Sequence, residues 1–124
     1  MSEKPVVLLV DNKPESKEIF SKIAQEFPFN LLVAEDGQAG FDLARQEIPD
    51  LIVIRKNVPI LNAQSVSVLL KQSSATEKIP ILVICPDLSP EDKEKFQDAG
   101  CNDCLKEVKD VDVVKAKLKE WLEV

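Results

Sequence analysis

The chain has 124 residues, of which 44% are hydrophobic and 31% charged, and its formal net charge is −6. This composition is typical of one compact domain, and the acidic balance argues against nucleic acid and anionic membranes as partners, because both bind basic surfaces. The chain contains no histidine, which excludes histidine-based acid–base catalysis and histidine metal ligands.

The cysteine count and the apolar runs bear on location. Three cysteines are an odd number and too few for a disulfide scaffold, so we expect reduced thiols. No apolar run approaches the roughly 20 residues of a membrane span. Residues 1–5 are too short and too charged, ahead of the first apolar run, to form a signal peptide. We therefore expect a cytoplasmic protein with no membrane contact and a single domain over residues 1–124.

Apolar residues follow two alternating patterns along the chain. Short apolar runs predict strands, and apolar residues at helical spacing predict amphipathic helices. In chain order, the predicted elements are a strand at 6–10, a helix at 14–27, a strand at 29–34, a helix at 38–47, a strand at 50–54, a helix at 63–73, a strand at 80–85, a helix from Pro90 (after the cap Ser89) that Gly100 terminates, a short strand at 101–105 and a final helix over 111–122. This alternation predicts a doubly wound α/β fold with a parallel sheet and helices on both faces.

The centre of the predicted sheet is the run that begins at the turn Pro49-Asp50 and continues through Leu51 to Ile54. Its unbroken apolar residues indicate a strand covered on both faces. The residue just past such a strand lies at the carboxyl edge of the sheet, where open α/β folds place their chemistry. That residue is Arg55, so this edge of the sheet carries a cation and not a carboxylate.

Five segments share an order and a spacing that are characteristic when taken together. They are Val6 to Asp11, Asp36-Gly37, Pro49 to Ile54 with Pro59 beyond, Ile79 to Ile84, and Ala99 to Leu105. In this arrangement the chain resembles the receiver domain of bacterial two-component response regulators over essentially its full length. The resemblance implies a CheY-like, flavodoxin-like (βα)5 fold, with a five-stranded parallel sheet in the order 2-1-3-4-5 and a crevice at the carboxyl ends of strands 1 and 3.

A working receiver takes a phosphoryl group from a partner histidine kinase onto an aspartate, and this implied chemistry makes demands at defined positions. The third strand must end in a carboxylate nucleophile, and two acidic residues after the first strand must help it to hold Mg²⁺. A Thr or Ser after the fourth strand and a Lys after the fifth then hold the phosphoryl oxygens.

This sequence departs from the receiver pattern at most of these positions. The residues found there are Asn12 for the second acid, Arg55 for the acceptor, Cys85 for the hydroxyl, Glu107 for the lysine and Cys104 for the aromatic switch residue. Arginine is a fixed cation and cannot be phosphorylated by this chemistry. Lys106 lies one residue before the lysine position of the receiver pattern. In an extended chain, a shift of one residue points a side chain to the other face.

Asp11 is the one carboxylate that remains of the implied site, and it is the only residual candidate for a metal ligand. We expect it to pair with Arg55, whose guanidinium would then occupy the place of Mg²⁺. Lys56, beside Arg55, is expected to be solvated, although both residues could instead form an anion site at the sheet edge. We therefore expect no Mg²⁺, no other cofactor and no aspartyl phosphate.

Cys101 and Cys104 form a C-x-x-C motif, which raises redox and zinc interpretations. Zinc needs further ligands, and with no histidine only Cys85 remains. Redox motifs of this kind favour a helix N-terminus, whereas this motif leads into a predicted strand. We therefore expect packing roles for these cysteines, while a thiol switch between Cys85 and Cys104 stays open as an alternative.

Together these features predict a stand-alone, receiver-like signalling domain with a degenerate phosphorylation site, a pseudo-receiver with no output domain. We expect it to act by protein–protein interaction and not as an enzyme, as a monomer or a homodimer. The resemblance implies a partner surface on the fourth helix, fifth strand and fifth helix, although Trp121 and Leu122 are expected to pack in the core. Two alternatives remain, a true phosphorelay receiver with an atypical acceptor and a cysteine-based redox sensor.

Overall fold

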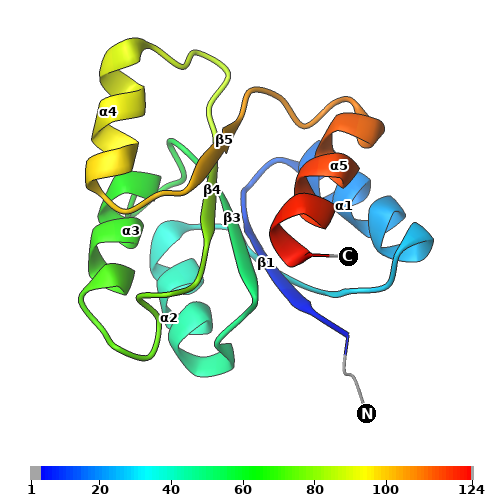
Figure 1. Ribbon diagram of the computed structural model, residues 1–124, viewed down its shortest axis with the longest axis horizontal. Coiled ribbons are helices and arrows are strands. Elements are labelled where there is room, and N and C mark those ends of the chain that lie inside the picture. The colour runs from blue at the N-terminus through cyan, green and yellow to red at the C-terminus, as the bar shows by residue number, and fades with distance from the viewer. Residues whose placement is uncertain (1–3, 124) are drawn as a thin grey trace.

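The computed structural model describes residues 4–123, so residues 1–3, on which the signal-peptide argument partly rests, lie outside the described residues. Ten elements alternate strictly along the chain (Figure 1). They are β1 (Val6–Val10), α1 (Pro14–Glu26), β2 (Asn30–Ala34), α2 (Gly37–Glu47), β3 (Leu51–Arg55), α3 (Ala63–Lys71), β4 (Ile81–Ile84), α4 (Pro90–Asp98), β5 (Asp103–Leu105) and α5 (Val111–Leu122). All ten predicted elements are present, and most of their ends agree with the prediction within two residues.

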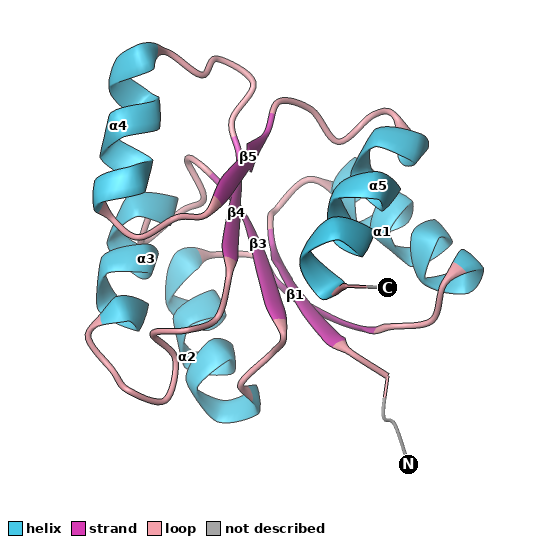
Figure 2. Ribbon diagram, viewed as in Figure 1, coloured by secondary structure: helices cyan, strands magenta, loops and turns pink. Residues whose placement is uncertain are grey.

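The five strands form one parallel sheet in the order β2-β1-β3-β4-β5, which confirms the predicted doubly wound fold. Figure 2 shows the sheet between two helical layers, with α1 and α5 on one side and α2, α3 and α4 on the other. This order places the carboxyl ends of β1 and β3 next to each other. Residues that follow these two strands therefore meet, although they are far apart in the sequence.

Both faces of the sheet are buried, which explains why the central strands β1 and β4, and β3 as far as Ile54, are apolar throughout. Leu8 and Val10 pack toward α2, α3 and α4, whereas Val7 and Leu9 pack toward α1 and α5. All four side chains are fully buried. Burial of one such side chain contributes about 1.5–3 kcal/mol, so the sheet forms a rigid support for residues at its carboxyl edge.

Two strand ends differ from the prediction in ways that bear on the site. β3 extends to Arg55, which is therefore the last residue of the strand and not the first residue past it. β5 begins at Asp103 and not at residue 101. Cys101 closes the end of α4 instead: Gly100 adopts φ +94°, and the Cys101 N–H donates to the Phe96 carbonyl over 2.8 Å. No helix in the described chain is both long enough and apolar enough to span a membrane.

Candidate functional site

Asp11 directly follows β1 at the carboxyl edge of the sheet. Its N–H donates to the Ala34 carbonyl over 2.9 Å, so its backbone continues the pairing with β2. Its side chain is 1% exposed, and Oδ1 accepts hydrogen bonds from Arg55 Nε at 2.8 Å and from the Lys13 N–H at 3.1 Å. The second oxygen, Oδ2, is buried and has no hydrogen-bond donor among the described residues. The carboxylate is therefore enclosed by its own protein.

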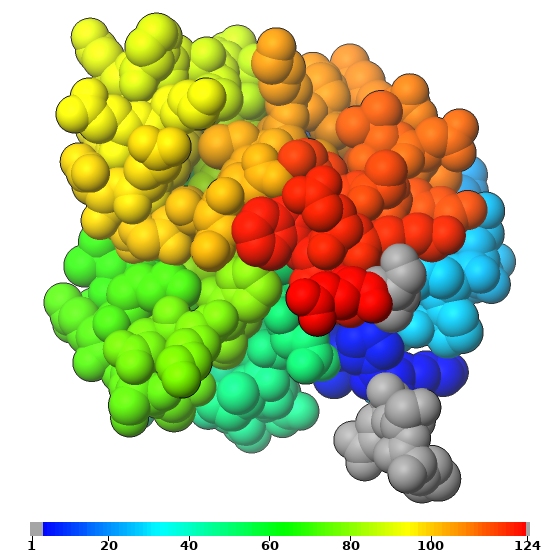
Figure 3. All heavy atoms as spheres, viewed as in Figure 1, coloured from blue at the N-terminus to red at the C-terminus, as the bar shows by residue number. Residues whose placement is uncertain are grey.

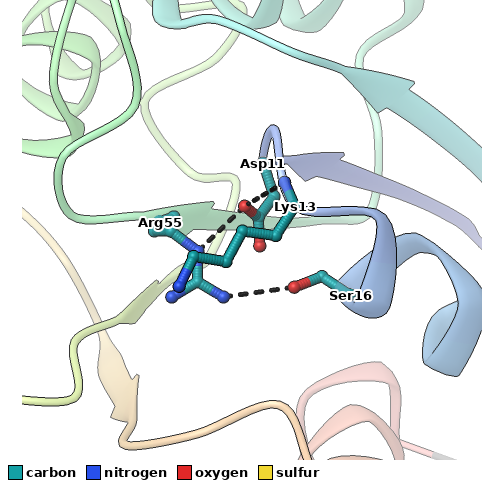
Figure 4. Close-up of polar contacts among 4 residues, drawn as sticks. All are labelled: Asp11, Lys13, Ser16 and Arg55. Atoms are coloured by element: carbon teal, nitrogen blue, oxygen red, sulfur yellow. Dashed lines mark hydrogen bonds and ion pairs between the residues drawn. The ribbon is translucent and has the colours of Figure 1, made fainter.

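Arg55 brings β3 into the same group of contacts. Its Nε donates to Asp11, and its Nη2 donates to the Ser16 hydroxyl at 3.1 Å (Figure 4). Ser16 is buried on the inner face of α1, and the Arg55 side chain is only 13% exposed. The ion pair between Asp11 and Arg55 that the sequence predicts is confirmed, and it joins β1, β3 and α1. Removing one member of such a buried pair costs about 3–5 kcal/mol, because the other charge is left unpaired.

Ser16 is a member of this group that the sequence analysis missed. A signal for it exists, since Ser16, Phe20 and Ile23 are spaced by four and three residues and share the buried face of α1. A serine on that face needs a polar partner when it is buried. Arg55 supplies that partner.

The sequence analysis expected Lys56 to be solvated and unpaired, but its amine is paired in the fold. Its Nζ donates to Asp92 Oδ2 at 2.9 Å, and this hydrogen bond raises the pKa of Lys56 and lowers that of Asp92. Asp92 lies in the first turn of α4, where it also forms a capping box with Ser89, the predicted cap. The end of β3 is thus tied to the start of α4. The prediction failed because Lys56 and Asp92 approach each other only through the tertiary fold.

A cavity of about 280 Å³ opens where β3 and β4 end, and we call it the Arg55 cavity. Its lining includes Asn12, Lys13, Arg55, Asn57, Cys85 and Asp87. The Cys85 thiol is buried, and burial raises its pKa, so it is neutral near pH 7. Three of the positions singled out in the sequence, Asn12, Arg55 and Cys85, therefore share one cavity, with Asp11 behind Arg55.

Comparison with known proteins places this geometry in context. No protein-family model matches the chain. The chain is 29% identical over 96 residues to the gliding motility regulatory protein of Myxococcus xanthus and 28% identical over 99 residues to protein PilH of Pseudomonas aeruginosa. These matches cover 77% and 80% of this chain, but 12% of the first relative and 82% of the second. The solved structure of chemotaxis response regulator CheY4 of Vibrio cholerae matches with a TM-score of 0.89 at 21% identity, over 96% of this chain and 99% of that chain.

The fold and the sequence relatives support a CheY-like receiver domain. The solved structure carries the fold, including the strand order that the sequence analysis expected. The curated relatives add similarity in sequence over most of this chain. Because the Myxococcus xanthus protein is far longer than this chain, the match concerns the receiver domain and not the activity of that whole protein.

Two of the remaining singled-out positions of this receiver domain lie apart from the Arg55 cavity. Glu107 is exposed, and its carboxylate pairs with the neighbouring Lys109 at 3.6 Å. Cys104 lies on β5 beside Val83 of β4 and faces a second hollow, of about 240 Å³, between α4 and β5. Lys106 lines this α4–β5 hollow as well, and it lies away from the Arg55 cavity.

The C-x-x-C cysteines of this receiver domain are free and half-buried. The Cys101 Sγ and the Ser67 hydroxyl are hydrogen-bonded at 3.1 Å. Burial raises the pKa of both Cys101 and Cys104, and the nearby Asp103 carboxylate adds to the effect at Cys104. Reactive thiols have a lowered pKa, so these environments fit packing better than thiol chemistry.

Proposed function

We propose that this receiver domain is a pseudo-receiver: a signalling module that works by binding a protein partner and does not accept a phosphoryl group on an aspartate. The observation that carries the proposal is the position of Arg55, which ends β3 and pairs with Asp11 at 2.8 Å. Arginine offers no carboxylate oxygen for an acyl phosphate. The proposed activity is binding, and the domain has no catalytic role of its own.

Asp11 is a poor alternative acceptor, which supports the proposal. A nucleophilic carboxylate oxygen must approach the phosphorus atom of the donor. Asp11 Oδ1 already accepts two hydrogen bonds, one of them from a cation, and Oδ2 is enclosed in a side chain that is 1% exposed. Attack by either oxygen would require the Asp11–Arg55 ion pair to open.

A magnesium ion does not fit the residues at this site. Mg²⁺ prefers several oxygen ligands in octahedral geometry, with carboxylates among them. The site offers one carboxylate, Asp11, and the Arg55 guanidinium already neutralises it. Asn12 adds a neutral amide, and within residues 4–123 no three acidic or thiol side chains converge on a point where a metal could be held. We therefore propose signalling without Mg²⁺.

The surface formed by α4, β5 and α5 is the proposed partner site. These elements lie side by side on one face, where Figure 3 shows α4 in yellow, β5 in orange and α5 in red. Asp103 on β5 accepts hydrogen bonds from Lys117 and from the Trp121 indole N–H at 3.0 Å, which fixes α5 against the strand. Trp121 is half-buried and packs against the core, as expected. Its indole N–H also holds α5 to Asp103.

The α4–β5 hollow gives this surface a recess with both apolar and charged lining. Leu88, Phe96 and Cys104 supply apolar area, and the exposed Lys93 and Lys106 stand beside it. A partner segment with an apolar anchor and acidic flanks would match this combination. Charge complementarity of this kind speeds association and selects partners more than it adds affinity.

Affinity capture with the immobilised domain tests this proposal. A partner is expected to bind equally with and without Mg²⁺ and acetyl phosphate. Lys106→Glu is expected to reduce binding, whereas the matched variant Lys109→Glu, which changes an exposed lysine outside the hollow, is expected to leave binding unchanged. Binding that requires the phosphodonor, or equal loss in both variants, would refute the proposed mode of action.

A further inference from the structure

The Arg55 guanidinium keeps hydrogen-bonding capacity that the protein does not use. Of its five N–H donors, one serves Asp11 and one serves Ser16. The other three, two on Nη1 and one on Nη2, have no acceptor in the described part of the chain. Arg55 lines a cavity of about 280 Å³, which offers space for an acceptor beside these donors.

Lys13 adds a second cation to the same cavity. Both residues line the Arg55 cavity, and in the view of Figure 4 the Lys13 side chain passes across that of Arg55. Within residues 4–123 its amine has no ion-pair or hydrogen-bond partner. Two like charges that share a cavity repel each other, and an anion between them would convert that repulsion into two attractions.

The remaining lining of the cavity suits an oxyanion. Asn12 and Asn57 offer amide donors, and the Cys85 thiol is neutral. The Arg55 and Lys56 charges are compensated by Asp11 and Asp92, which leaves Lys13 and Asp87 as opposite charges at the rim. The site is therefore close to electrically neutral, and binding should rest on directed hydrogen bonds, with an affinity on the order of millimolar.

We propose that the Arg55 cavity binds a phosphate group non-covalently, with Arg55 and Lys13 as the two cationic donors. Guanidinium is well suited to this role, because its planar donors match two oxygens of a phosphate at once. The ligand is either free phosphate or the phosphate monoester of a small molecule. This inference goes beyond the proposed partner binding and does not depend on it.

Titration with inorganic phosphate tests the inference, followed by ¹H–¹⁵N NMR at constant ionic strength and without divalent ions. Saturable shifts are expected at the Arg55 Nε–Hε group and at the backbone amides of Asn12, Lys13 and Asn57. A parallel titration with glycerol phosphate separates the two sources. Tighter binding of the ester points to an organic phosphate, and equal binding points to free phosphate. No saturable response to either probe would overturn the inference.

Two variants with the same loss of charge provide the control. Lys13→Gln removes a cation from the Arg55 cavity, whereas Lys17→Gln removes one from a neighbouring hollow on α1. Lys13→Gln is expected to weaken phosphate binding about 3- to 5-fold, and Lys17→Gln to leave it nearly unchanged. Equal weakening by both variants would mean a general charge effect and no site. An unchanged intact mass after titration shows that the binding is non-covalent, so this test is separate from that of the pseudo-receiver proposal.

Discussion

Two regions of the molecule are built differently: the closed half, where β1 and β3 end, and the open half, along α4, β5 and α5. In the closed half, the opposite charges of Asp11 and Arg55 are buried and paired, with side chains 1% and 13% exposed. In the open half, the neutral thiols of Cys101 and Cys104 border the α4–β5 hollow, and the lysines Lys93 and Lys106 are exposed beside it. The closed half therefore stabilises the fold, whereas the open half is the proposed partner surface. The two halves can be tested separately.

The largest expected effect comes from opening the closed half. Arg55→Ala should lower the free energy of unfolding by about 3–5 kcal/mol, because Asp11 is then left as an unpaired buried charge. Urea denaturation measures this loss. Adding Asp11→Asn to the variant should recover a large part of it, because the amide carries no charge. A loss below about 1 kcal/mol in the single variant would mean that the ion pair is not the stabilising element of this half.

The closed half should become a metal site when its charge is reversed. In the double variant Asn12→Asp with Arg55→Asp, three carboxylates meet at the ends of β1 and β3, and Mg²⁺ should offset their repulsion. At a concentration 100 times the dissociation constant, Mg²⁺ should then stabilise the variant by about 2.7 kcal/mol. Thermal unfolding with and without Mg²⁺ measures this shift. The unmodified chain serves as the control and should show no such shift; stabilisation of both proteins would remove the contrast between the two halves.

The open half depends on Asp103, which holds α5 against β5. Burial alone would raise the pKa of Asp103, but hydrogen bonds from Lys117, Trp121 and the Cys104 N–H outweigh it and hold the pKa below its ordinary value. The stability from this lowered pKa is present above the unfolded value, about 3.9, and is lost as pH falls through the folded value. Asp103→Asn should therefore lose about 1 kcal/mol at pH 7, and the difference should shrink toward pH 3. Urea denaturation at the two pH values checks this, and a constant difference would contradict it.

The smallest effect is expected at the link between the two halves. Lys56→Gln removes the pair between the end of β3 and α4, which is about a third exposed on the lysine side. Partly exposed pairs contribute little, so we expect a loss of about 0.5 kcal/mol. Lys109→Gln is the control. The Lys109 amine lies 3.6 Å from the Glu107 carboxylate at the surface, so its loss should have no measurable effect. Equal values in urea denaturation would show that Lys56 does not link the halves.

The ion pair of the closed half could be predicted from the sequence, and the reason lies in the topology. Once the strand order places β1 beside β3, the residues after Val10 and at the end of β3 must meet, so the pairing of Asp11 with Arg55 follows. The apolar runs are enough to define those strands. The identities at the two ends then determine the chemistry of this half.

Contacts that depend on loop paths could not be predicted in the same way. Lys56 and Asp92 are 36 positions apart, and their contact depends on where the chain after β4 starts α4. Cys101 reads as strand in the sequence, yet its N–H closes the end of α4 because Gly100 turns the chain there. In both cases the deciding quantity is the path of a connection, and hydrophobic periodicity carries no information about it.

The central claim is that Arg55 has replaced the phosphoryl acceptor and closed the site around Asp11. Intact mass under denaturing conditions, after incubation with Mg²⁺ and acetyl phosphate, tests it most directly, with a phosphorylatable receiver domain as the positive control. The account predicts an unchanged mass for this chain, because a non-covalently bound phosphate is lost on denaturation. A stoichiometric phosphoryl adduct would contradict it, and would mean that Asp11 or another residue still accepts the group.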